Sequence, residues 1–238
     1  MSLRLACDLD GVLADMESAL VREARNLFGP TAASDARVRR APRHRPAGSP
    51  SDTRHVSGET VSSPPRLTSR QEQQLWRHVA TIEGFWETLK EIESGSVARL
   101  AVQARERRWE VVFLTKRPDS AGLTVQMQSQ RWLEAHGFRL PSVFVVRGSR
   151  GRVAAALGLD VVVDDRPENC VHVVTDSHAR AILLWRHDPK DVPIAARRPG
   201  IHVAKTFDEC LAHLSKLAPG GIRRGLVGRM IGRLGFKA

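Results

Sequence analysis

The sequence predicts an α/β fold, a Rossmann-like parallel sheet flanked by helices. From Ser96 onward, short and continuously apolar runs alternate with segments of helical periodicity, as in parallel sheets that are covered on both faces. Polar side chains follow three of the apolar runs of the chain, where the strands of such a sheet would end. A largely helical stretch, residues 70–95, follows the first strand–helix unit and predicts a small helical cap inserted there.

The first unit consists of a predicted strand, Leu3–Cys7, and a predicted helix, Met16–Phe28, whose apolar residues recur at helical spacing. Asp8 and Asp10 lie between the two. Residues i and i+2 of an extended chain point to the same side, so we expect both carboxylates at one site. Gly11 permits a tight turn toward the helix. Taken alone, the two acids could equally cap a turn, and other parts of the chain decide between these readings.

The later strands are short apolar runs, and two of the helices between them end at Gly137 and Gly158. The predicted strands are Glu110–Leu114, Ser142–Val146, Val161–Val163, Ala181–Trp185 and Ile201–Ala204. The predicted helices are Gln71–Thr81, Ser96–Arg108, Ser120–His136, Arg152–Leu157, Glu168–Ser177 and Phe207–Leu217.

These elements divide the chain into four parts. Residues 1–28 and 96–217 form the predicted core, and residues 70–95 form the cap. Residues 29–69 are rich in Pro, Ser, Arg and Ala with almost no large apolar side chains. Such a segment buries too little surface to offset its ordering entropy, so we expect a disordered basic insertion. Residues 218–238 form a basic amphipathic tail.

The composition is that of a globular protein, with 238 residues of which 42% are hydrophobic and 26% charged. No apolar run is long enough to cross a bilayer, and the first strand begins at once, so we expect no signal peptide. The three cysteines are widely separated, which excludes a disulfide framework and a zinc-ligand spacing. They favour free thiols in a reducing compartment, and we expect a cytoplasmic protein.

The net charge of +11 lies almost wholly on two peripheral segments. Residues 30–70 hold eight arginines against three acidic residues, and residues 219–238 hold five basic residues and no acidic one, which gives +5 for each segment. The rest of the chain is close to neutral, so the charge indicates no firm nucleic-acid partner. The tail could lie on an anionic membrane, but we expect it to dock on its own domain or to stay disordered. The oligomeric state is left open.

Polar groups that follow three strands are expected to meet at one edge of the sheet. Several carboxylates close together repel one another unless a hard cation lies between them, and oxygen ligands of this kind suit Mg²⁺. Such a cation also neutralises a phosphate, which a nearby carboxylate can attack. The groups concerned are the carboxylates of Asp8, Asp10, Asp164 and Asp165, the hydroxyl of Thr115, and the cations of Lys116 and Arg117.

Three segments in this order, Asp8–Asp15, Phe113–Pro118 and Val163–Cys170, carry a specific resemblance to a known family. They resemble motifs of the haloacid dehalogenase superfamily of phosphohydrolases, whose first motif is Asp-x-Asp-Gly-Val. Within it they resemble the branch of the 5'(3')-deoxyribonucleotidases and related 5'-nucleotidases, whose small cap segment resembles Gly84–Leu89. The resemblance covers roughly Leu3 to Leu217 without the insertion.

The resemblance implies a role for each matched residue. Asp8 matches the nucleophile that forms an aspartyl-phosphate, and Asp10 matches the acid/base that protonates the leaving oxygen and then activates water. Thr115 matches the phosphate-binding hydroxyl. The implied Mg²⁺ ligands are the Asp8 carboxylate, the Asp10 backbone carbonyl and the pair Asp164-Asp165. We expect Asp164 to be the direct ligand with Asp165 behind it, although the sequence leaves this choice open.

The third motif of the family commonly holds a lysine, and here the chain departs from it. The matching position is Arg150, with Arg152 as the other candidate. Arginine keeps the positive charge but presents a planar fork instead of a point charge, so the geometry of phosphate binding differs. We expect Arg150 to bind phosphate together with Lys116, for which a solvated loop charge is the alternative.

Three further residues are predicted to line the substrate pocket. Phe85 and Trp86 stand beside a glycine in the cap, where packing in the core is the alternative. Arg117 follows the strand that ends at Leu114, and a solvent-exposed charge is its alternative.

The sequence therefore predicts a Mg²⁺-dependent phosphomonoesterase acting on a small phosphorylated molecule, with a nucleoside 5'-monophosphate as the favoured substrate. A phosphatase for a sugar phosphate or another small metabolite is the nearest alternative. A non-catalytic protein that binds nucleic acid or membrane through its basic segments is the alternative from another class.

Overall fold

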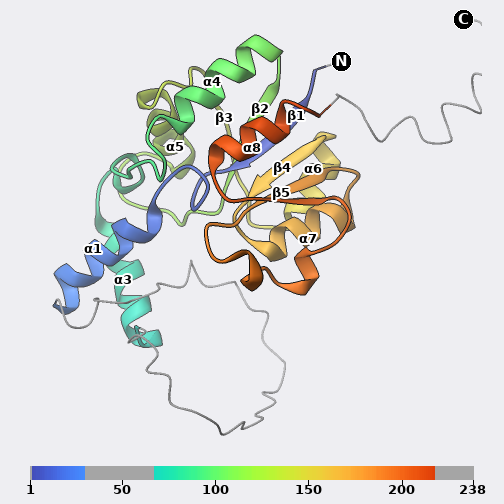
Figure 1. The fold of residues 1–238 in the computed structure, drawn as a ribbon. Helices are drawn as coiled ribbons and strands as arrows, with labels where there is room; N and C mark the ends of the chain where they lie inside the picture. Colours follow the sequence, from blue (N-terminus) through green and yellow to red (C-terminus); the bar gives the residue numbers. More distant parts are fainter. Residues whose placement is uncertain (1, 30–66, 218–238) are drawn as a thin grey trace, which may run out of the picture.

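The computed structural model describes residues 2–29 and 67–217 (Figure 1). Within those residues, six parallel strands form one sheet in the order β3-β2-β1-β4-β5-β6. This confirms the predicted parallel α/β architecture. The strands are β1 (Arg4–Asp8), β2 (Glu110–Thr115), β3 (Ser142–Val145), β4 (Val161–Asp164), β5 (Arg180–Leu184) and β6 (Ile201–Ala204).

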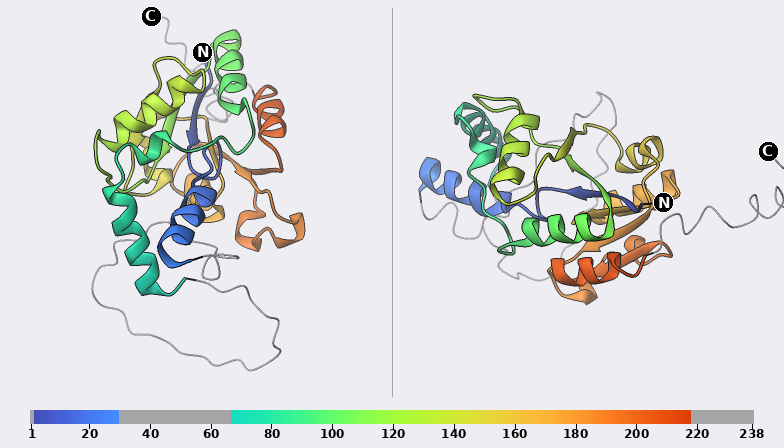
Figure 2. Two further views of the ribbon diagram at one scale, coloured as in Figure 1. Left: turned by 90° about the vertical axis from the view of Figure 1, so that its left-hand side faces the viewer. Right: turned by 90° about the horizontal axis from the view of Figure 1, so that it is seen from above.

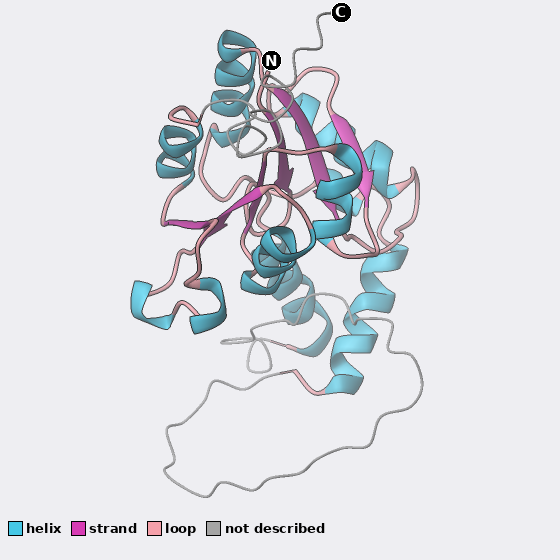
Figure 3. Cartoon of the chain, turned by 90° about the vertical axis from the view of Figure 1, so that its right-hand side faces the viewer, coloured by secondary structure: helices cyan, strands magenta, loops and turns pink. Residues whose placement is uncertain are grey.

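Helices cover both faces of the sheet, and Figure 3 shows the strands as a layer between them. Several helices begin at a side chain that caps the first turn, such as Asp15, Thr68 and Ser149. The α-helices are α1 (Met16–Phe28), α3 (Ser69–Thr81), α4 (Ser96–Arg107), α5 (Val125–Ala135), α6 (Arg150–Leu157), α7 (Pro167–Asp176) and α8 (Phe207–Leu214). Single turns of 3-10 helix are η1 (Phe85–Glu87), η2 (Pro189–Asp191) and η3 (Ile194–Ala196).

The core has two halves, one on each face of the sheet, because successive strand residues point to opposite faces. Leu5 and Cys7 of β1 belong to the half that α4, α5 and α8 cover, whereas Ala6 belongs to the half under α6 and α7. The strands β4 and β5 divide in the same way. Both faces are apolar, which explains why the strands read as continuous apolar runs.

The order of the strands places β1 next to β4 in the middle of the sheet, and β2 on the other side of β1. The direction of the chain across the sheet reverses between β1 and β4. In open parallel sheets this reversal leaves a crevice at the carboxyl ends of the strands, where ligands bind. Asp8 ends β1, Asp164 ends β4 and Thr115 ends β2, so all three are delivered to that crevice.

Several predicted helix boundaries differ from the structure, and two of the differences have a clear physical reason. The helix predicted at Ser120–His136 begins only at Val125, since Gly122 adopts a left-handed conformation with a φ of 87° and Thr124 caps the helix. The helix predicted from Arg152 begins two residues earlier, at Arg150, because the Ser149 hydroxyl accepts hydrogen bonds from the first turn.

The helices α1 and α3 lie side by side and project away from the sheet, as both views in Figure 2 show. The apolar residues that α1 buries, such as Leu20, cluster with Leu75 and Val79 of α3. The helical projection therefore includes α1, which the sequence assigned to the core. A capping box between Thr68 and Gln71 begins α3, so this helix starts at Ser69, two residues before the predicted start.

Residues 30–66 of the predicted insertion and the whole predicted tail, 218–238, lie outside the described residues. Among the residues that are described, no helix has both the length and the apolar character needed to cross a bilayer. Cys7, Cys170 and Cys210 are buried free thiols, as the sequence predicts. Burial raises the pKa of the Cys170 thiol, and the carboxylates of the neighbouring aspartates raise it further.

A histidine pair on the sheet edge makes the stability depend on pH. The rings of His202 on β6 and His213 on α8 stack at 3.6 Å between centroids. Burial lowers the pKa of both groups below the usual 6.5, and the nearby charge of Lys216 lowers both further. At His213, His202 and Arg180 also lower the pKa. At His202, the Glu209 carboxylate opposes the shift.

We expect the free energy of unfolding to decrease as the pH falls below about 6.5, because the unfolded chain then binds protons that the folded pair resists. Urea unfolding between pH 5 and pH 8 measures this, with His202→Gln as the comparison. The variant should lose part of the slope; equal slopes in both proteins would contradict the assignment.

Candidate active site

The turn after β1 brings two carboxylates to the crevice. Asp8 and Asp10 are both only 5% exposed. Gly11 follows, and its N–H donates to the Ala14 carbonyl at 3.0 Å, which closes a tight turn. Its φ of 86° lies in the left-handed region, where a residue with a side chain would have a strained backbone. Asp15 then caps α1 by accepting from the Ser18 N–H at 3.0 Å.

An arginine that follows β5 donates hydrogen bonds to the backbone of the same turn. The guanidinium of Arg186 donates to the carbonyls of Gly11 at 2.7 Å and Val12 at 3.1 Å. It also pairs with Glu93 at 2.7 Å, and Glu93 accepts the N–H of Phe207 at the start of α8. These contacts join the turn to two distant segments and fix the place of both carboxylates.

Asp8 faces a buried arginine. Arg150 is 4% exposed, and its Nη2 contacts Asp8 Oδ1 at 2.5 Å, while its Nε lies 3.7 Å from Asp164 Oδ2. Its Nη1 is buried and has no hydrogen-bond partner within the described part of the chain. A buried N–H donor without a partner is costly, so this fork is suited to an anion that supplies the missing acceptor. Arg152 is exposed on α6, so of the two candidate arginines Arg150 is the one that lies beside Asp8.

Close packing of α6 on α7 places Arg150. Gly151 is next to it, and a Cβ at that position would overlap the backbone carbonyl of His172 in α7. The Ser149 hydroxyl donates to the Asp176 carboxylate at 2.9 Å and thereby ties the same turn to the end of α7. The first turn of α6 therefore depends on a residue without a side chain.

A cluster of carboxylates lies at the ends of β1 and β4. Oxygens of Asp8, Asp164 and Asp165 come within 4.8 Å of one another. Asp164 is fully buried and accepts hydrogen bonds from the Asn169 amide at 2.9 and 3.0 Å and from the Arg166 N–H at 2.9 Å. Three carboxylate donors so close together fit a hard divalent cation such as Mg²⁺. The Asp10 side chain is not part of this cluster.

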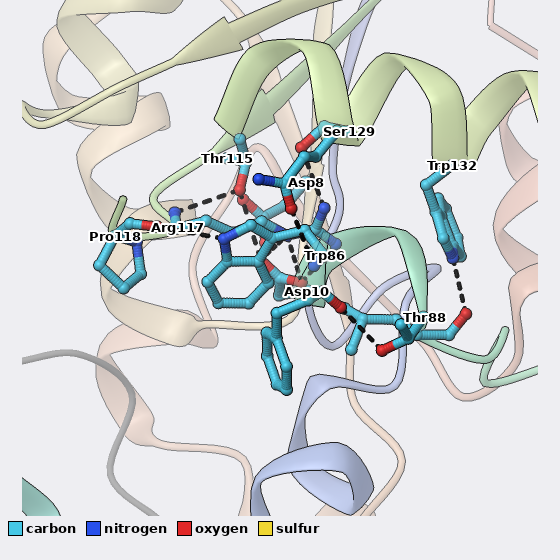
Figure 4. A network of polar contacts seen from close by, with 12 residues as sticks. Asp8, Asp10, Trp86, Thr88, Thr115, Arg117, Pro118, Ser129 and Trp132 are labelled. Carbon is cyan, nitrogen blue, oxygen red and sulfur yellow. Dashed lines mark hydrogen bonds and ion pairs between the residues drawn. The ribbon is translucent and has the colours of Figure 1, made fainter. Parts of the chain in front are cut away.

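Asp10 instead pairs with Arg117 (Figure 4). Arg117 Nε lies 3.0 Å from both Asp10 oxygens, and its Nη2 lies 2.8 Å from Oδ1. The Thr115 hydroxyl donates to Asp10 Oδ2 at 3.3 Å and is fully buried. Thr115 thus contacts the acid directly in this structure.

A cleft opens at Asp8 and Asp10. Its cationic and polar lining comes from Lys116, Arg117, Arg150, Arg166 and Asn169 beside the two aspartates. Its apolar side is made by Met16, Trp76 and Pro118, of which Trp76 belongs to α3. The projecting helix pair therefore supplies a wall of the cleft.

Phe85 and Trp86 lie elsewhere. Both are about 1% exposed or less, stack edge to face at 4.9 Å between ring centroids, and are absent from the cleft lining. The structure therefore places them in the core, which corrects the prediction that they line the pocket. The aromatic residue of the cleft lining is Trp76, which lies in the middle of α3 and to which the sequence analysis gives no role.

Comparisons with known proteins bear on the fold. The sequence matches no protein-family model and no curated protein. A hydrolase from Pseudomonas syringae is 18% identical, with 91% of this chain and 100% of the other covered and a TM-score of 0.50. A candidate beta-phosphoglucomutase from Thermotoga maritima is 17% identical, with 91% and 100% covered and a TM-score of 0.51. A HAD family hydrolase from Deinococcus radiodurans R1, with bound phosphate and sodium, is 15% identical, with 92% and 99% covered and a TM-score of 0.50.

The chain has the HAD hydrolase fold. At such identities the likeness concerns the arrangement of the elements alone. What the site of this HAD fold can do has to be argued from its own residues.

The sequence indicates the carboxylates and their partners Arg117, Arg150 and Thr115, but not three other residues around them. Asp8, Asp10, Asp164 and Asp165 followed from their positions after predicted strands, and the fold brings them to one edge. Asn169, Ser129 and Trp76 were given no role. Their signal is weak, because each lies on a helix whose rotation relative to the site the sequence does not specify.

The contact of Gly151 with α7 generates a stability prediction. We expect Gly151→Ala to lower the free energy of unfolding by about 1–3 kcal/mol, the usual cost of overpacking, because its Cβ overlaps the His172 carbonyl. Urea unfolding measures the difference. Gly148→Ala is the matched control, since a Cβ there meets no atom within 4 Å; equal stability of the two variants would contradict the packing argument.

Proposed function

We propose that this chain is a Mg²⁺-dependent phosphomonoesterase that works through an aspartyl-phosphate, with a nucleoside 5'-monophosphate as its favoured substrate. The observation that carries the proposal is the surrounding of Asp8. A buried carboxylate faces Arg150, whose Nη1 lacks an acceptor, and lies beside two further carboxylates at the topological switch point. A phosphate placed there meets a nucleophile and a fork of positive charge together.

In the first half of the reaction an oxygen of Asp8 attacks the phosphorus atom. The bond between phosphorus and the ester oxygen breaks, and its electron pair stays on that oxygen. Asp10, two residues on, supplies the proton that makes the leaving group an alcohol. Arg150 exchanges its contact with Asp8 for the phosphate oxygens, whose negative charge spreads in the transition state.

In the second half Asp10 accepts a proton from a water molecule, whose oxygen attacks the phosphorus. The bond between phosphorus and Asp8 breaks, inorganic phosphate leaves and the carboxylate of Asp8 is restored. The carboxylates of Asp8, Asp164 and Asp165 would hold the Mg²⁺ ion, with the Asp10 backbone carbonyl. The ion supplies positive charge that lets these acids and the phosphate approach one another.

The shape of the cleft supports a substrate with a flat or ring-shaped organic part. Trp76 brings an indole to the lining of the cleft, which also includes Met16 and Pro118. A nucleobase stacks on such a face. A sugar phosphate is the second candidate, since a sugar ring packs on the same indole and two solved structures with this fold, at 17% and 15% identity, are named as a beta-phosphoglucomutase and as binding phosphate.

The reaction is tested by measuring phosphate release from a panel of nucleotides and sugar phosphates. We expect the wild type to require Mg²⁺ and to lose activity with EDTA. Asp8→Asn removes the nucleophile and should abolish turnover, and Asp10→Asn should reduce kcat by roughly 10²–10⁴-fold.

Asp119→Asn is the matched control, because Asp119 is an exposed carboxylate that follows the same strand as Thr115. It should leave turnover unchanged. A wild type that releases no phosphate from any compound, or an Asp8→Asn variant as active as the wild type, would refute the mechanism and favour a non-catalytic role.

Substitution of Trp76 tests the substrate class. Stacking of a base on an aromatic ring contributes about 1–3 kcal/mol, so Trp76→Ala should raise the KM for nucleotides by about tenfold or more. Trp76→Phe should restore most of the affinity, and the KM for acetyl phosphate should not change. A rise in KM for acetyl phosphate equal to that for nucleotides would show that the residue acts on the fold instead of the base.

A further inference from the structure

Arg117 is a buried residue at the edge of the cleft, and its side chain contacts three other parts of the protein. Its side chain has no exposed surface, and its ion pair with Asp10 involves Nε and Nη2 at 2.8–3.0 Å. A buried guanidinium is stable only when it is paired and hydrogen-bonded. Here the pairing is with the residue two positions after Asp8.

The remaining contacts of Arg117 come from two other elements (Figure 4). Its Nη1 donates to the Ser129 hydroxyl on α5 at 2.9 Å. Its guanidinium carbon lies 5.0 Å from the centroid of the Trp86 ring, within the range of a cation–π contact. The Trp86 indole donates to the Pro118 carbonyl at 3.1 Å, so the ring itself is fixed.

These contacts orient the Asp10 carboxylate unequally. Oδ1 accepts from both Nε and Nη2 of Arg117, which occupies its lone pairs. Oδ2 shares the Nε–H and has a longer contact, 3.3 Å, with the Thr115 hydroxyl. Both oxygens therefore have two donors, and the contacts of Oδ2 are the longer ones.

We propose that Arg117 is a positioning residue: anchored by Ser129 and Trp86, it holds Oδ1 of Asp10 so that Oδ2 exchanges the proton with the leaving group and the water. This assignment rests on the proposed function and adds to the prediction that Arg117 lines the substrate pocket, because Arg117 is among the residues that line the cleft. It also gives Trp86 a role, because its buried ring packs against Arg117, which in turn pairs with Asp10.

The proton balance defines what loss of Arg117 does. In the first half of the reaction the proton on Oδ2 moves to the ester oxygen as the bond to phosphorus breaks. An alkyl leaving group needs this proton, whereas p-nitrophenolate leaves as a stable anion. A misplaced Asp10 therefore slows the first step for a nucleotide and spares it for p-nitrophenyl phosphate.

The experiment measures the first turnover by rapid quench, with a nucleoside 5'-monophosphate and with p-nitrophenyl phosphate. Arg117→Ala should slow the nucleotide by roughly 10²-fold or more, with a much smaller change for p-nitrophenyl phosphate. Added guanidinium chloride at low millimolar concentration should restore part of the nucleotide rate. Ser129→Ala, which removes one anchor and disturbs the fold less, should give a smaller loss of the same kind.

Arg131→Ala is the matched control, because Arg131 is a half-exposed arginine on α5 whose nearest carboxylate, that of Glu87, is 3.9 Å away. It should leave both rates unchanged. Equal losses with both substrates in Arg117→Ala and Ser129→Ala, or a change confined to KM, would overturn the assignment. A wild type that forms no phosphoenzyme from either substrate would overturn the proposed function and this inference with it.

Discussion

The burial of three carboxylates at one edge of the sheet is the constraint on which the site depends. Asp8, Asp10 and Asp164 are each at most 5% exposed, and like charges so close together are unfavourable without compensation. Two buried arginines supply part of it, since Arg150 pairs with Asp8 and Arg117 with Asp10. The two pairs differ in kind. Among the described residues, Arg150 Nη1 has no hydrogen-bond partner, whereas every nitrogen of Arg117 has one. The first arginine is suited to receive a ligand and the second to hold a neighbour.

Each arginine reaches its place through a different packing device. Arg150 starts α6, and its position follows from the close approach of α6 and α7 at Gly151. Arg117 lies in the loop after β2, and its position follows from the indole of Trp86 and the hydroxyl of Ser129. The turn that follows Asp8 and Asp10 is fixed by hydrogen bonds from Arg186 to its backbone carbonyls. Side chains far apart in the sequence therefore set the geometry of a site a few ångströms wide.

The helix pair α1 and α3 relates the fold to the choice of substrate. The sheet edge presents charge and hydrogen-bonding groups, whereas Trp76 and Met16 present apolar surface from the projecting helices. A phosphate would be recognised by the sheet edge and the organic part by the helices. Under the proposed function, catalysis and substrate selectivity would lie on separate elements, as is common where one fold serves many substrates.

The sequence by itself determined the parallel α/β sheet and the four carboxylates. Continuous apolar runs predict buried strands, and residues that follow parallel strands gather at one edge of the sheet. The site residues Asp8, Asp10, Asp164 and Asp165 could therefore be predicted without knowledge of tertiary contacts. Only the tertiary structure decided which cations meet them, that Trp86 is buried and that Trp76 lines the cleft. The physical reason is that such pairings depend on how helices rotate and how loops fold over the sheet edge. Those are set by packing between distant segments, which local periodicity does not record.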